Sequence, residues 1–229
     1  MVVQYKPVGS LVDIRTHILK VATRRFARQG FDSTSLQEIA DDVGVKKPSL
    51  LHHFPSKNEL LRAVLDVLFE HWTEVLPRLL EAVTSGRARF FEAITAELVS
   101  FFREDPDRAR LVVRELLDRP QQMQGRLAQT LTPWVTLIAD YIRKSQQSGH
   151  VYESVDPEAY ILHIVTLTVS AIAAFPVVGQ ALSGTKEEVA ERHLKELSRI
   201  ARASLFVRPP PQGDAPPATA KQPQDERRE

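Results

Sequence analysis

Cysteine is absent from this chain of 229 residues, so neither a disulfide framework nor thiolate chemistry is available to it. The net charge is also small, +1 at neutral pH, which argues against a protein that coats nucleic acid along its whole length. The N-terminal segment MVVQYKPVGS contains no apolar stretch long enough for a signal peptide. We therefore expect a cytoplasmic protein.

Catalytic motifs are missing as well. The sequence contains no phosphate-binding glycine loop, no HExxH helix and no GxSxG turn. His52 and His53 are adjacent on a predicted helix, so they cannot both face one metal ion. We therefore expect a protein that is not an enzyme, with no catalytic residues, no metal site and no cofactor.

Strand patterns are absent from the sequence, because no stretch alternates apolar and polar residues; this predicts an all-α fold. Apolar residues recur instead at helical spacing. The first expected helix begins near Ser10 or Asp13 and ends at Gly30; the others span about 36–43, 48–54, 57–77, 87–103, 107–118, 127–141, 158–175 and 185–205. The longest apolar run, residues 164–182, is interrupted by polar residues, Pro176 and Gly179. It fits a helix that is buried on all sides better than a membrane span, and no membrane is an expected partner.

Two short predicted helices organise the N-terminal part of the chain. The stripe of the first consists of Leu36, Ile39, Ala40 and Val43. Gly44 can end this helix in a left-handed conformation, and Pro48 suits the first turn of the next one. Leu50 and Phe54 then point the second helix back at the first. Two short helices joined in this way form a helix-turn-helix unit.

The predicted outer face of the second helix carries cations and hydrogen-bond donors. Lys46, Lys47, Ser49, His52 and Lys57 lie on it or beside it, without a carboxylate before Glu59. The whole segment 1–62 carries +4, whereas the remainder carries −3. Such a face suits the phosphates and the major groove of DNA, although an ordinary solvated helix face would look similar.

Helix caps add two further DNA-contact candidates. Thr34 with Gln37 and Ser35 with Glu38 each form a possible capping box, and the sequence does not choose between them. Either hydroxyl, with the free amides of that first turn, can hold a DNA phosphate. Lys57 lies beside a third predicted N-terminus, where helix and side chain both supply positive potential.

The spacing of this segment resembles the N-terminal domain of the tetracycline-repressor (TetR) family of bacterial regulators. The matching residues are Gly30, Phe31, Thr34, Ser35, Ile39, Ala40, Gly44, Val45, Lys47, Leu50, His53, Phe54, Ser56, Lys57 and Leu60. The resemblance implies a DNA-backbone contact by Lys57. This chain has Leu51 where family members usually carry tyrosine, Lys46 where they have a small capping residue and Pro48 where glycine is frequent. Lys46 or Lys47 would then replace the tyrosine's phosphate contact.

The resemblance implies two domains: a helix-turn-helix DNA-binding domain at 1–62, and a helical ligand-binding and dimerisation domain at 63–207. Residues 208–229 include six prolines and no apolar residue larger than alanine, so we expect a disordered tail.

Pro133 predicts a kink in the middle of a helix, and a kink leaves room for a pocket. The candidate lining residues are Phe90, Phe102, Trp134, Tyr141 and His163, although each is also a plausible core residue. Arg110 and Arg114 lie four residues apart and would pair with an anionic ligand, or else face solvent or acids such as Glu97.

The last two predicted helices suit dimerisation, because small residues in the first permit close approach and the second has a regular apolar seam. The candidate interface residues are Val169, Ala173, Leu194, Leu197, Ala201 and Leu205. In the alternative, both helices only complete the core of the monomer.

The predicted function is that of a homodimeric repressor on a palindromic double-stranded DNA operator, released by an unknown small and largely apolar effector. The alternative is a dimeric DNA-binding protein without a ligand, whose C-terminal domain serves dimerisation or protein contact.

Overall fold

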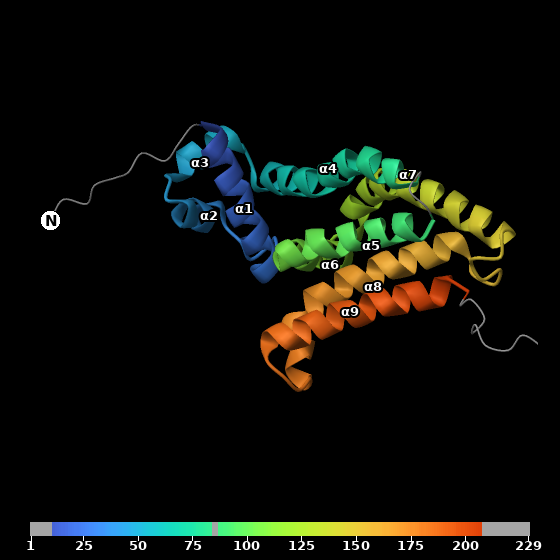
Figure 1. The fold of residues 1–229 in the computed structure, drawn as a ribbon. Helices are drawn as coiled ribbons and strands as arrows, with labels where there is room; N and C mark the ends of the chain where they lie inside the picture. Colours follow the sequence, from blue (N-terminus) through green and yellow to red (C-terminus); the bar gives the residue numbers. More distant parts are fainter. Residues whose placement is uncertain (1–10, 84–86, 208–229) are drawn as a thin grey trace, which may run out of the picture.

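The computed structural model describes the backbone at residues 11–83 and 87–207 and the side chains at residues 14–75 and 91–207. In these ranges the chain forms nine α-helices and one short 3-10 helix, so the all-α prediction is confirmed (Figure 1). The helices are α1 (Leu11–Gln29), α2 (Leu36–Val43), α3 (Lys47–His53), α4 (Lys57–Val83), α5 (Arg87–Glu104), α6 (Pro106–Asp118), α7 (Pro120–Gln147), α8 (Pro157–Val178) and α9 (Lys186–Leu205). The tail predicted at 208–229 lies outside the described residues.

Figure 1 shows α1, α2 and α3 gathered at one end of the molecule, with α4 leading away from them toward the longer helices. Helix α1 packs against α2, α4 and α6, and α6 packs in turn against α8. One hydrophobic core therefore runs from Phe26 and Leu50 in the helix-turn-helix to Leu111 of α6 and Val169 of α8. A second core joins α5, α7, α8 and α9 around Ile138 and Leu205.

The ends of the short helices follow their local sequence. Ser35 is the N-cap of α2: its hydroxyl accepts a bond from the Glu38 amide, and the Glu38 carboxylate accepts one from the Ser35 amide. This resolves the choice between the two predicted capping boxes. Gly44 ends α2 at φ +80°, a conformation that side chains disfavour, and Pro48 lies in the first turn of α3. The predicted helix-turn-helix geometry is therefore confirmed.

Helix α8 differs from the prediction of burial on all sides. Its inner face includes Ile161, Val169 and Ile172, but Leu162 and Leu167 are 46% and 42% exposed. The segment 157–181 is long and apolar enough to cross a membrane by length and composition. It packs nevertheless against α5, α6, α7 and α9 as part of the helical core, which supports a folded helix with one uncovered face.

Candidate DNA-binding surface and effector pocket

Helix α3 is held by one buried side and presents the other to solvent. Leu50 is fully buried and Phe54, directly after the helix, is nearly so. The exposed residues are Lys46, Lys47, Pro48, Ser49 and His52, while Leu51 is half-buried at the edge of this surface. The predicted contact residues of α3, apart from the half-buried Leu51, are therefore accessible to solvent.

Two carboxylates of the neighbouring helix α2 are already paired. Arg25 of α1 donates to both oxygens of Asp42, at 2.7 and 2.8 Å, and to Glu38 at 3.3 Å. Hydrogen bonding to Arg25 lowers the pKa of the Asp42 carboxyl. Among the described residues, neither Lys46 nor Lys47 has a carboxylate partner. The positive charge of α3 is thus available to an external anion such as phosphate.

Two predicted phosphate contacts have structural roles instead. The Lys57 ammonium donates to the carbonyl oxygens of Phe31, Asp32 and Thr34 at 2.8, 3.3 and 2.9 Å, so its three donors are used inside the chain. Thr34 is buried, and its hydroxyl donates to the Gly30 carbonyl at 2.7 Å. In this conformation neither group is free to bind phosphate, contrary to the prediction. Ser35 remains exposed at the start of α2.

The turn between α1 and α2 packs through Phe31 against Arg119, the residue directly after α6. The Lys57 ammonium lies 4.4 Å from the centre of the Phe31 ring, and the Arg119 guanidinium lies 3.9 Å from it. Arg119 also donates to the buried carboxylate of Glu115, with Nε at 3.0 Å. Burial raises the pKa of Glu115, and the neighbouring Arg119 opposes that rise. Sequence reasoning missed this junction, although the i, i+4 spacing of Glu115 and Arg119 was a usable signal.

A cavity of about 250 Å³ lies between α4, α5, α6, α7 and α8. Its aromatic walls are Phe69, Trp72, Phe102 and Trp134, and its polar side chains are Thr130, Thr166 and Ser170. No charged side chain lines it among the described residues. The α7 segment around Pro133 forms one wall, as predicted from the sequence. A site of this composition suits an apolar molecule with few hydrogen-bonding groups.

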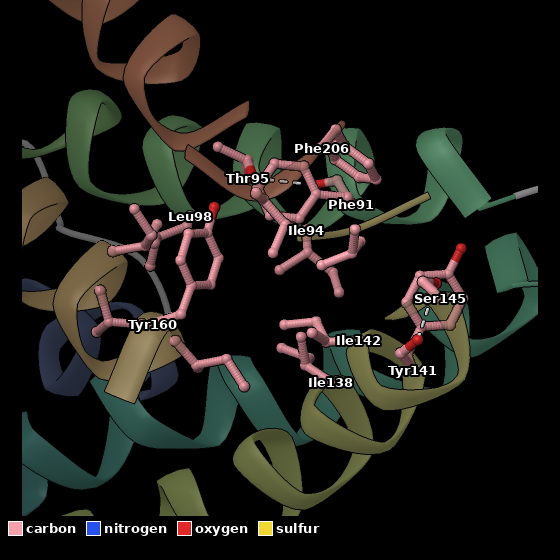
Figure 2. A pocket seen from close by; sticks show the side chains of 15 residues that line it. Phe91, Ile94, Thr95, Leu98, Ile138, Tyr141, Ile142, Ser145, Tyr160 and Phe206 are labelled. Atoms are coloured by element: carbon pink, nitrogen blue, oxygen red, sulfur yellow. Dashed lines mark hydrogen bonds between the residues drawn. The ribbon is translucent and has the colours of Figure 1, made fainter. Parts of the chain in front are cut away.

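A second, smaller cavity of about 50 Å³ lies between α5, α7, α8 and the end of α9. Figure 2 shows Phe91, Tyr160 and Phe206 around it, with Ile138 and Ile142 on the opposite side. The Tyr160 hydroxyl donates to the Ala201 carbonyl at 2.5 Å, and burial raises its pKa well above the usual value. The two cavities share the aliphatic residues Ile94, Leu98, Ile138, Ile161 and Val165.

Comparison with known proteins places this architecture in a family. Residues 18–64 match the family described as bacterial regulatory proteins, tetR family. The structure of the ketosteroid transcriptional regulator KstR2 of Mycobacterium tuberculosis superposes with a TM-score of 0.69, covering 89% of this chain and 100% of that one at 16% identity. The chain belongs to the TetR family.

The sequence relatives of this TetR-family chain include two named regulators. The transcriptional repressor KstR2 of Rhodococcus jostii is 39% identical over 72 residues, which cover 30% of this chain and 35% of that protein. The match to KstR2 thus spans about a third of the relative's length. The transcriptional regulator RutR of Escherichia coli is 28% identical over 171 residues, or 73% of this chain and 77% of RutR.

The predicted ligand residues of this TetR-family chain fall in different places. Phe102 and Trp134 line the larger cavity, and Tyr141 lines the smaller one. His163 is exposed on α8, so its predicted place in the pocket wall is wrong. The side chain of Phe90 lies outside the described residues. Sequence reasoning also missed Trp72, whose ring centre lies 6.0 Å from that of Trp134.

Arg110 and Arg114 line neither cavity. They lie in an open groove between α6 and α8, together with Asp118 and Ser170. Arg110 donates to Asp107 at 3.2 Å, whereas the predicted alternative partner, Glu97, contacts His71. For Arg114, the structure shows no hydrogen bond or ion pair within the described part of the chain.

The predicted dimer seam faces the interior of this chain. Val169, Leu197, Ala201 and Leu205 are buried, and Ala173 and Leu194 are half-buried against the same core. For these four buried residues the seam prediction is wrong, because they contact the chain's own helices. For Ala173 and Leu194 it stays a prediction. The uncovered apolar residues on and around α8 and α9 are Leu162, Leu167, Val177, Val178, Leu182, Ile200 and Val207.

Proposed function

We propose that this TetR-family protein is a homodimeric transcriptional repressor that leaves a palindromic operator when a small, largely apolar effector fills the larger cavity. One observation carries the proposal: α6 contacts both functional regions. Its residues Val112, Val113 and Leu116 line the cavity. Arg119, the residue directly after α6, packs its guanidinium on the ring of Phe31 in the turn between α1 and α2. A ligand in the cavity that moves α6 would therefore also shift α1 and the turn at Phe31, which position the helix-turn-helix.

The DNA-binding part of the proposal rests on α3. In each protomer α3 would enter the major groove, with Lys46 and Lys47 at phosphates and Ser49 and His52 at base edges, next to Pro48 and Leu51. Ser35 and the N-terminus of α2 would hold a further phosphate. A twofold dimer would place two such helices in successive major grooves, about 34 to 36 Å apart.

The dimer part rests on the uncovered face of α8. Leu167, Ser170, Ala174 and Val177 are all exposed in the single chain, at i, i+3, i+7 and i+10 along one side of the helix. An exposed apolar stripe of this length is unfavourable in water unless another surface covers it. A second copy of the same helix would cover it by twofold symmetry. This stripe replaces the seam predicted from the sequence.

The effector part rests on the composition of the cavity. The name of one relative, the ketosteroid transcriptional regulator KstR2, describes a regulator linked to an apolar polycyclic compound class. The aromatic and aliphatic walls here suit a ligand of comparable apolar character. In the competing possibility, a dimeric DNA-binding protein without a ligand, this cavity would bind no effector.

A selection from random duplexes with the full-length protein tests the proposal. We expect the selected pool to converge on a palindrome whose half-sites lie about one helical turn apart. A thermal-shift screen of diverse apolar compounds then tests for an effector, with stabilisation expected from compounds that also release the duplex. A pool that stays random would contradict the proposed function, and a screen with no stabilising compound would favour the ligand-free alternative.

A further inference from the structure

We propose that the effector is an elongated apolar molecule with a single anionic group at one end, with that group bound by Arg110 and Arg114. This inference rests on the proposed effector role of the larger cavity and names the chemical class of its ligand. The anionic group would be a carboxylate or a phosphate, since both match the planar donors of arginine.

Three adjacent hollows, which share lining residues, suit an elongated ligand. The open groove that contains the two arginines shares Val113 and Ser170 with the larger cavity. The larger cavity shares Ile94, Leu98 and Ile138, among others, with the smaller one. The walls change along this path from charged at the groove to entirely uncharged in the interior. Such a gradient matches a ligand with one charged end and an apolar body.

The arginines can receive an anion at the mouth of this path. Arg114 has no hydrogen-bond or ion-pair partner among the described residues, and Arg110 is held only by Asp107. Asp107 is shared, since Arg28 of α1 also contacts it at 3.1 Å. Asp118 is the carboxylate that lines the groove itself. The groove and its neighbours Arg28 and Asp107 therefore carry one net positive charge, which suits a single anionic group.

Arg114 also connects this mouth to the DNA-binding end. Its guanidinium lies so close to Gly30 that a Cβ built there would be 2.5 Å from Nη1. Gly30 follows the C-terminus of α1, where the helix dipole attracts a cation. An anion in the groove would compete for Arg114 and weaken this contact. Because Ser170 and Ala174 also belong to the proposed dimer face, the mouth would lie beside the second protomer.

Tryptophan fluorescence tests the inference directly, because both tryptophans of the chain, Trp72 and Trp134, line the larger cavity. The probes are dodecanoate, dodecyl phosphate and the uncharged dodecanol, titrated into the full-length protein without DNA. We expect at least one of the two anions to bind about tenfold or more tightly than dodecanol, as is typical of hydrogen bonds to charged groups. The tighter of the two anions identifies the head group. Equal affinity of all three probes would overturn the inference.

Matched variants assign the preference to the groove. R110Q/R114Q should remove the advantage of the anion while leaving dodecanol affinity unchanged, which also shows that the cavity is intact. R110K/R114K keeps both positive charges and should retain part of the anion's affinity advantage over dodecanol. The control is R103Q, because Arg103 is exposed on α5 and lines none of the three hollows. A preference that survives in R110Q/R114Q would show that the arginines do not bind the head group.

The length of the ligand's hydrocarbon chain tests whether the ligand reaches the smaller cavity. Affinity should rise about fourfold per methylene group from octanoate until the smaller cavity is filled. Ser145 lines only that cavity, so S145L should weaken tetradecanoate about tenfold or more and leave octanoate unchanged. If S145L weakened octanoate and tetradecanoate equally, the longer ligand would not extend into the smaller cavity. A protein that binds these anions but shows no duplex preference would keep this inference and lose the proposed function, so the two failures are distinguishable.

Discussion

Replacement of Arg119 by methionine should destabilise the junction between α6 and the helix-turn-helix in a pH-dependent way. The variant R119M keeps the apolar stem against Phe31 but removes the charge that lies over its ring and pairs with Glu115. Glu115 is 1% exposed, so its carboxylate would lose its cationic partner inside the protein. Loss of one partner of a buried ion pair costs about 3 to 5 kcal/mol. Because the Arg119 side chain is itself 14% exposed, we expect the lower end, about 3 kcal/mol.

The direction of the pH effect follows from the pKa of Glu115. Burial raises this pKa above its unfolded value, and loss of Arg119 raises it further. A raised carboxyl pKa favours the folded state fully at low pH, and that advantage is lost as the pH rises through the folded pKa. The stability difference between R119M and wild type should therefore be small near pH 4, below the usual carboxyl pKa, and full at pH 7.

Urea denaturation at both pH values, at one fixed protein concentration, measures this difference. In a separate thermal scan at pH 7, the same loss of about 3 kcal/mol should lower the melting temperature by about 6 to 12 °C for a chain of this size. The double variant E115Q/R119M is the control: it carries no buried charge and should recover much of the loss. An equal loss at both pH values, or no recovery in the double variant, would refute the assigned role of Glu115.

Three further perturbations test other parts of the account. Lys47→Ala should weaken binding to all duplexes alike and flatten the salt dependence by about one unit; sequence-selective loss in filter binding would show a base contact instead. Leu167→Asp should give a folded monomer at micromolar concentration by analytical ultracentrifugation, whereas an unchanged dimer would remove α8 from the interface. Gly44→Ala should cost about 1 kcal/mol, because φ is +80° and no neighbouring atom obstructs the new methyl group; an unchanged urea midpoint would contradict that strain.

Local patterns in the sequence predict local structure well. Gly44 ends α2 as expected, and the Thr185–Glu188 capping box begins α9. The choice between Thr34 and Ser35 could not be made, because both fit a cap and only the packed structure buries Thr34. Its hydroxyl then bonds backward to Gly30 instead of forward along the helix.

Contacts between segments that are distant in the sequence could not be predicted from it. Lys57 resembles a phosphate contact, but its side chain folds back onto carbonyls 23 to 26 residues earlier. The stripe of α9 shows that Ala201 and Leu205 are buried, yet periodicity does not show whether a partner or the chain's own helices bury them. For the pocket, Pro133 indicates the right helix, whereas Trp72 on α4 approaches it only through the tertiary fold.

The central claim is that the cavity and α3 are coupled through α6. The most direct measurement is fluorescence anisotropy of a labelled, selected operator duplex, titrated with the protein in the presence and absence of a compound already shown to change tryptophan fluorescence. The account predicts that the compound lowers operator affinity, and that the operator lowers affinity for the compound by the same factor. A compound that fills the cavity while operator affinity stays unchanged would contradict the account.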